Sequence, residues 1–163
     1  MGRNLFVVFA FFAVLGGPVA LATADSPEAL GDVRAVFLYD LETTAVADLI
    51  DGDLEDCAFT GATISFATCN LTGASLVWTG PKGTTVTVPM DEVRYFKPEG
   101  VPWREYVFSG VITQTVQGID VLNPVSFKIV QGVKDAATMH GTLTLGAVGE
   151  TFGFRAVPLP VAP

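Results

Sequence analysis

The sequence has few of the residues on which catalysis and charge-based recognition depend. Of its 163 residues, one is histidine and two are cysteine, and 9 basic residues stand against 17 acidic ones. A protein that binds nucleic acid uses clusters of lysine and arginine to neutralise phosphates, and no three consecutive residues here are basic. Two cysteines are too few for a four-cysteine zinc site. The composition therefore argues against a nucleic-acid partner and against such a zinc site.

Catalytic motifs are also lacking. Hydrolytic triads need a general base, most often histidine, and His140 is the single histidine of the chain. It precedes Gly141 at the edge of an expected strand, and no serine lies in a G-x-S-x-G motif. A histidine-based metal site would need several ligands. We therefore expect no enzyme, no catalytic residue and no cofactor.

One long hydrophobic run is present, and it lies at the N-terminus. Arg3 precedes eleven consecutive apolar residues, 5–15, and two A-x-A sites follow, the second ending at Ala24. This is the layout of a secretory signal peptide, and the run is shorter than the roughly 20 residues that span a bilayer. The sequence predicts a signal peptide over residues 1–24 and a secreted or periplasmic protein with no transmembrane anchor after cleavage.

The two cysteines, Cys57 and Cys69, are twelve positions apart. In an oxidising compartment a single pair of this kind is typical of a structural disulfide. A redox pair is the alternative, but the spacing is not C-x-x-C and no flanking basic residue lowers a thiol pKa. We therefore predict a Cys57–Cys69 disulfide.

The chain after the signal peptide is rich in valine, isoleucine and threonine, which favour strands. Glycine and proline separate short alternating segments, a pattern typical of an antiparallel β-sandwich or a small β-barrel. The sequence thus predicts an all-β single domain over residues 25–157 and an extended Pro-rich tail over 158–163. The expected strands are residues 33–41, 76–79, 84–88, 105–117, 119–130, 138–145 and 150–157.

The beginning of this domain is ambiguous between helix and strand. Ser26 and Pro27 suit a helix N-cap and first turn, and Val33, Phe37 and Leu41 would lie on one stripe of such a helix. The segment alternates equally well as a strand, with apolar residues at 33, 35, 37, 39 and 41. Because the rest of the chain is β-rich, we expect a strand.

A segment from Pro89 to Tyr106 combines seven charged residues with four aromatic ones. Its prolines and Gly100 predict an ordered loop, and loops on rigid β scaffolds commonly carry recognition. Aromatic rings beside arginine suit stacking on a sugar or packing on a partner. The alternative is a loop pinned to its own core. The candidate ligand-binding residues are Arg94, Tyr95, Trp103, Arg104 and Tyr106.

Acidic residues are densest just before Cys57. Asp51, Asp53 and Glu55 match the opening of a calcium-binding loop, because calcium takes several oxygen ligands from one flexible segment. Asp56, however, stands where an EF-hand requires glycine, and Ala62 where it requires glutamate. These acids are therefore a weak calcium candidate, with a solvated turn as the alternative.

Two functions remain open from the sequence. The first is a non-catalytic domain that binds a glycan, matrix component or extracellular protein through the 89–106 segment. The second is a carrier of a small apolar ligand, because residues 140–152 resemble the closing hairpin of the YceI-like polyisoprenoid-binding family. Such a carrier would have a YceI-like or lipocalin-like barrel, and the chain length suits an eight-stranded barrel that holds one ligand. An interior tunnel would favour the carrier, and a filled core with exposed Trp103 would favour surface binding.

Overall fold

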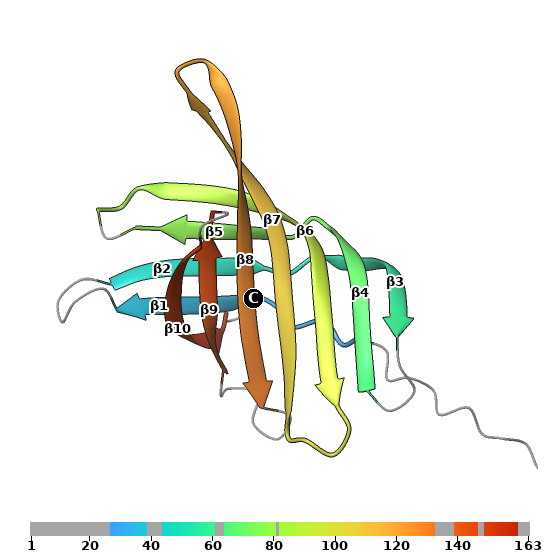
Figure 1. Cartoon of the computed structure of the whole chain (residues 1–163). Helices are drawn as coiled ribbons and strands as arrows, with labels where there is room; N and C mark the ends of the chain where they lie inside the picture. Colours follow the sequence, from blue (N-terminus) through green and yellow to red (C-terminus); the bar gives the residue numbers. More distant parts are fainter. Residues whose placement is uncertain are drawn as a thin grey trace, which may run out of the picture.

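The computed structural model describes residues 27–38, 44–60, 64–80, 82–132, 139–146 and 149–159, and within these ranges it holds strands and no helix (Figure 1). The predicted all-β class is confirmed, and the strands form one domain. The strands are β1 (Val33–Leu38), β2 (Thr44–Ile50), β3 (Asp53–Thr60), β4 (Ile64–Thr72), β5 (Ser75–Thr79), β6 (Thr85–Pro98), β7 (Trp103–Val116), β8 (Ile119–Gly132), β9 (Met139–Leu145) and β10 (Glu150–Pro158).

Eight of these strands close into an antiparallel barrel. Their order is β6-β5-β2-β1-β10-β9-β8-β7, and β7 returns to pair with β6. Strands β4 and β3 are additional, with β4 paired to β6 and β3 at the open edge. Of the two architectures expected from the sequence, the barrel is the one observed.

Strand β6 changes partner half-way along its length. Residues 85–89 pair with β5, and residues 92–98 pair with β4 on the same edge. The register on β7 shifts between Met90 and Glu92, which marks a bulge at Asp91. Since a bulge adds one residue, it reverses the alternation, and the buried positions change from even to odd numbers. The bulge therefore bends the sheet and lets β4 and β3 leave the barrel.

Gly52 allows the chain to turn from β2 into β3 at the same corner. A Cβ atom there would lie 2.5 Å from the carbonyl oxygen of Thr72 and 2.6 Å from the amide nitrogen of Ala74. Ala74 in turn accepts a hydrogen bond from the amide of Met90, at 3.1 Å. Only glycine leaves room for these backbones to approach so closely.

The hairpins agree with the predicted strands. Gln117 and Gly118 connect β7 to β8 with φ of 53° and 80°, as a two-residue turn of the primed type requires. Gly80 accepts a hydrogen bond from the amide of Gly83 between β5 and β6, at 2.9 Å. The ambiguous N-terminal segment is the strand β1 from Val33, and residues 39–41 of that prediction lie outside the described residues.

Large side chains fill the inside of the barrel. Phe37 contacts both Trp78 and Phe154 edge to face, with ring centroids 4.9 and 5.1 Å apart. Phe127 stacks on Phe154 at 4.7 Å. Further fully buried side chains include Leu49, Leu76, Met90, Phe108, Ile129 and Leu143. The barrel wall is therefore held by a packed core.

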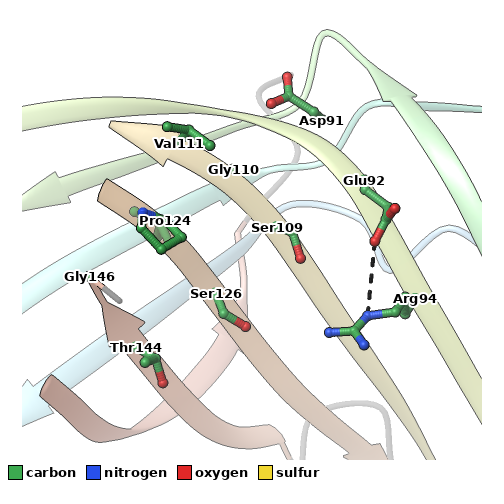
Figure 2. Close-up of a pocket in the computed structure, with 11 residues that line it drawn as sticks. Asp91, Glu92, Arg94, Ser109, Gly110, Val111, Pro124, Ser126, Thr144 and Gly146 are labelled. Atoms are coloured by element: carbon green, nitrogen blue, oxygen red, sulfur yellow. Dashed lines mark ion pairs between the residues drawn. The ribbon is translucent and has the colours of Figure 1, made fainter. Parts of the chain in front are cut away.

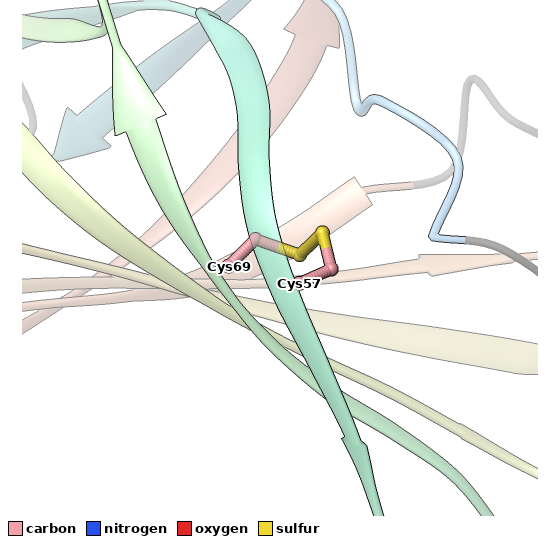
Figure 3. The surroundings of a disulfide bond; sticks show 2 residues. All are labelled: Cys57 and Cys69. Carbon is pink, nitrogen blue, oxygen red and sulfur yellow. A yellow bond between two sulfur atoms is a disulfide. The ribbon is translucent and has the colours of Figure 1, made fainter.

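The predicted disulfide is confirmed. Cys57 and Cys69 are bonded at an S–S distance of 2.09 Å and connect β3 to β4 (Figure 3). Cys69 is fully buried. The bond ties the open-edge strand to the sheet and is consistent with an extracytoplasmic protein. The predicted signal peptide and the last residues of the tail, 160–163, lie outside the described residues.

Candidate functional site

A groove of about 500 Å³ runs over the outward face of β6, β7, β8 and β9 (Figure 2). An adjoining hollow of about 310 Å³ shares Arg94, Ser126 and Thr144 with it. Both are open to solvent, and together they are named the outer groove. Its polar lining consists of Asp91, Glu92, Arg94, Glu105, Ser109, Ser126, Lys128, Thr142 and Thr144, and its aromatic lining of Phe66 and Phe96.

Side chains with hydroxyl groups form a row across the outer groove. Ser109 on β7 lies opposite Ser126 on β8, which lies opposite Thr144 on β9 (Figure 2). Thr151 on β10 continues the row, with its Oγ1 3.2 Å from that of Thr144. Neighbouring strands are about 4.8 Å apart. The row, named the hydroxyl row, therefore offers one hydroxyl at each step of that length.

Two ion pairs border the hydroxyl row. Arg94 Nε lies 4.0 Å from a carboxylate oxygen of Glu92, and Lys128 Nζ lies 2.7 Å from one of Glu105. Val107 separates the two cations, since Arg94 and Lys128 are its cross-strand partners on either side. All four charged side chains are partly exposed, and such pairs are weak in water. They can therefore exchange partners with polar groups of a ligand.

Aromatic rings lie at one end of the outer groove. Phe96 on β6 is the cross-strand partner of Phe66 on β4, and its ring centroid is 5.9 Å from that of Trp103. All three side chains are half-buried. They offer partly accessible ring surface beside the charged pairs.

The five residues predicted to bind a ligand do not share one face of the sheet. Arg94 is exposed in the outer groove, and Trp103 lies outward at the aromatic end. Tyr95 and Tyr106 are 1% and 2% exposed in the barrel core. Arg104 alternates inward with Tyr106. Arg94 thus lies in the outer groove, and both tyrosines lie in the core.

The prediction that residues 89–106 form a loop is wrong. The segment is the second part of β6, a turn over residues 99–102 and the start of β7. Pro89 lies beside the bulge, Pro98 ends β6 and Pro102 precedes β7. Each proline therefore lies where the strand pairing is irregular or ends, so that it does not interrupt a regular ladder.

Arg104 and Tyr106 hold the N-terminal segment against the end of the barrel. The Arg104 guanidinium forms an ion pair with Glu28. The Tyr106 hydroxyl donates to the carbonyl oxygen of Glu28 at 3.1 Å. Burial raises the pKa of Tyr106 and, to a smaller extent, that of Tyr95. These contacts give the inward-facing predicted residues a structural role.

The acidic residues before Cys57 do not gather around one point. Asp51 accepts hydrogen bonds from the amides of Gly31 and Gly52 at 2.8 and 3.0 Å, and burial raises its pKa. Asp53 and Glu55 lie on the exposed strand β3. Among the described residues, no three histidine, cysteine or acidic side chains are placed to hold a metal ion. His140 is exposed on β9.

Sequence reasoning did not identify the hydroxyl row. The sequence feature that could have revealed part of it is the two-residue turn at Gln117 and Gly118, because such a turn fixes the register of the two strands that it joins. Counting back from that turn places Ser109 opposite Ser126, as observed. Thr144 could be added only after the pairing of β8 with β9 was known.

Comparisons with protein-family models, with curated proteins and with solved structures found no match for this chain. Over the described ranges, no helix is long and apolar enough to cross a membrane.

Proposed function

We propose that this protein is a non-catalytic, secreted or periplasmic binding domain that holds an extended glycan in the outer groove. The observation that carries the proposal is the hydroxyl row with its two bordering ion pairs. Serine and threonine hydroxyls both donate and accept, carboxylates accept from sugar hydroxyls, and arginine and lysine donate to ring and hydroxyl oxygens. These groups lie on paired strands, so little backbone conformational freedom is lost on binding.

The aromatic end of the outer groove supports the same ligand class. Aromatic rings pack on the apolar faces of sugar rings while their edges remain wet. Phe66, Phe96 and the neighbouring Trp103 provide this surface beside Arg94. A chain of sugars could therefore contact rings at one end and hydroxyl groups further along.

The packed interior gives more support to surface binding than to the apolar carrier. A carrier needs an internal volume for its ligand. The positions that would line such a volume hold Phe154, which contacts both Phe37 and Phe127. The apolar carrier is the second candidate, and the one observation that favours it is that the barrel is closed.

The proposed location outside the cytoplasm is supported by the disulfide and the N-terminal sequence pattern. N-terminal sequencing of the exported protein tests it. The expected first residue is Asp25, and a cytoplasmic protein that retains Met1 would contradict this part of the proposal.

Ligand binding is tested by thermal shift of the oxidised protein with oligosaccharides, fatty acids and long-chain isoprenoids. A ligand at 100 times its Kd stabilises by about 2.7 kcal/mol. Arg94→Ala and Ser126→Ala remove groove groups. Arg34→Ala is the matched control, because Arg34 is exposed and paired with Asp48 at 2.7 Å on β1 and β2.

We expect an oligosaccharide to stabilise the wild type and Arg34→Ala equally, and Arg94→Ala to weaken its binding by about tenfold, or 1.4 kcal/mol. A sugar response unchanged in Arg94→Ala and Ser126→Ala would place the site elsewhere. Stabilisation by an isoprenoid or fatty acid alone would favour the carrier.

A further inference from the structure

Strands β7 and β8 continue beyond the barrel as a two-stranded ribbon, here named the β7–β8 arm (residues 111–124), which rises above the other strands in Figure 1. The pairing of β6 with β7 ends at Gly110, and the pairing of β8 with β9 ends at Val125. Beyond these points the two strands pair only with each other in the described chain. At the base of the arm the Pro124 carbonyl oxygen accepts from the amide of Gly146 at 2.8 Å. Beyond that point, both outer edges of the arm present backbone groups without a strand partner.

The arm carries the most exposed large hydrophobic side chains of the described residues. Ile119 is 68% exposed and Leu122 is 67% exposed. Val116 at the tip is 53% exposed, and Val111 and Val121 are each 41% exposed. The register places Val116, Ile119 and Val121 on one face of the ribbon and Val111 and Leu122 on the other. Exposed apolar side chains on a projecting element are typical of an interaction site.

The two edges of the arm differ in their protection against pairing. The β8 edge contains Asp120 and Pro124, and charge and proline are the usual guards of an edge strand. The β7 edge, residues 111–116, reads Val-Ile-Thr-Gln-Thr-Val, with no charge, proline or glycine. Such a segment pairs readily with another strand. The β7 edge is thus the unguarded one.

The open edge of β3 is guarded. Strand β3 carries Asp53, Glu55 and Asp56, and its register on β4 shifts between Glu55 and Ala58. Acidic side chains and a bulge both oppose edge-to-edge association. Of these two edges, the β7 edge is therefore the one open to strand addition.

We propose that the β7 edge of the arm pairs antiparallel with the same edge of a second copy, so that two arms form one four-stranded sheet. The net charge of −8 makes two copies repel. No charged residue lies between Glu105 and Asp120, so contact through the arms keeps the acidic barrels apart. The β7 edge has no charged side chain with which to recognise a charged peptide. A second copy of the chain fits better, because in a two-fold contact the same edge serves as the surface of both partners.

The symmetry also limits the register. A two-fold axis perpendicular to the sheet places each residue opposite one from the same face, so the pairing is centred on Thr113 or Gln114. Six residues span about 20 Å. This ribbon offers less than the roughly 800 Å² per partner of a standard interface, so a weak, micromolar dimer is expected.

The test is sedimentation velocity of the oxidised protein from about 1 to about 300 µM, a range that brackets micromolar affinity. The edge variant is Thr113→Lys with Gln114→Lys. The control is Leu122→Lys with Val121→Lys, whose positions are the direct cross-strand partners of the first pair. Both variants add the same charge to the same arm, and circular dichroism checks that both stay folded.

We expect a concentration-dependent dimer whose Kd rises at least about tenfold in the edge variant and stays within about twofold in the control, since like charges oppose pairing only when they face each other. A wild type that is monomeric throughout would overturn the proposal. An equal loss of dimer affinity in both variants would also overturn the proposal, because it would show that the copies contact each other through the face of the arm.

A cross-link gives an independent readout. Opposed residues in an antiparallel pair have Cα atoms about 4.5–5.5 Å apart, within the range of a disulfide. Thr113→Cys or Gln114→Cys should therefore form a covalent dimer on a non-reducing gel. Leu122→Cys, on the other edge, should not, and equal cross-linking of all three would contradict the edge pairing.

Discussion

Tyr95 and Tyr106 lie directly opposite each other on β6 and β7, with ring centroids 5.3 Å apart inside the barrel. Their neighbours Arg94 and Glu105 point to the outer groove. The same two strands therefore supply the core on one face and the candidate binding surface on the other. Any variant of this region changes stability or binding according to the face on which its side chain lies.

Tyr106→Phe should make the protein less sensitive to alkaline pH. Burial raises the pKa of Tyr106 in the folded state. Its contribution to stability is therefore fully present below the unfolded pKa of about 10 and is lost as the pH rises through the folded pKa. Urea denaturation from neutral pH upward measures this. The variant should lose about 1 kcal/mol at neutral pH with the hydrogen bond to Glu28 and then show a shallower alkaline decline. A decline parallel to the wild type would contradict the prediction.

Removal of the disulfide should lower the free energy of unfolding by roughly 3 kcal/mol, since the bond closes a short loop. The variant is Cys57→Ser with Cys69→Ala, because Cys69 is buried and Cys57 is not. Chemical denaturation measures the loss. The reduced wild type serves as the control and should approach the variant, while an unchanged midpoint in both would contradict a stabilising role.

Gly141→Ala should destabilise the barrel by about 2 to 3 kcal/mol through overpacking. A Cβ atom there would clash with the carbonyl oxygen of Lys128 and lie 2.7 Å from Cζ of Phe154. Gly153→Ala, on the adjacent strand β10, is the matched control, since no atom lies within 4 Å of its Cβ position. That control should change stability by no more than about 0.5 kcal/mol. Equal thermal midpoints for the two variants would refute the close approach.

Phe127→Ala should cost about 3 to 5 kcal/mol, because it removes a fully buried ring that stacks on Phe154. Phe59→Ala removes the same side chain from an exposed position of β3, where it is 45% accessible. Its cost should stay below about 1 kcal/mol. Calorimetry of both variants distinguishes a packed interior from a loose one, and a small loss for Phe127→Ala would indicate internal space for a ligand.

Much of the local structure could be predicted from the sequence because it depends on neighbours along the chain. Alternation of apolar and polar residues identified the strands after residue 105. The Gln117-Gly118 turn set the β7–β8 register. The cysteine pair was sufficient for the disulfide.

The 89–106 segment could not be assigned in the same way. Its prolines and charges resemble those of a loop, and the positions that make them compatible with strands depend on long-range pairing. Pro89 is accommodated by the change of partner in β6, and the charges of Glu92 and Arg94 by the open outer groove. Neither feature can be read from adjacent residues.

By itself, the sequence determined the β class, the disulfide and the nearest strand pairs, since propensity, alternation and turn chemistry act over a few residues. Tertiary structure alone decided that the sheet closes, that Tyr95 faces the core, and that Thr144 on β9 lies beside Ser126 and completes the hydroxyl row. The reason is that closure and bulges set which face of each strand is buried. Those pairings join residues far apart in the chain, where no local pattern specifies a partner.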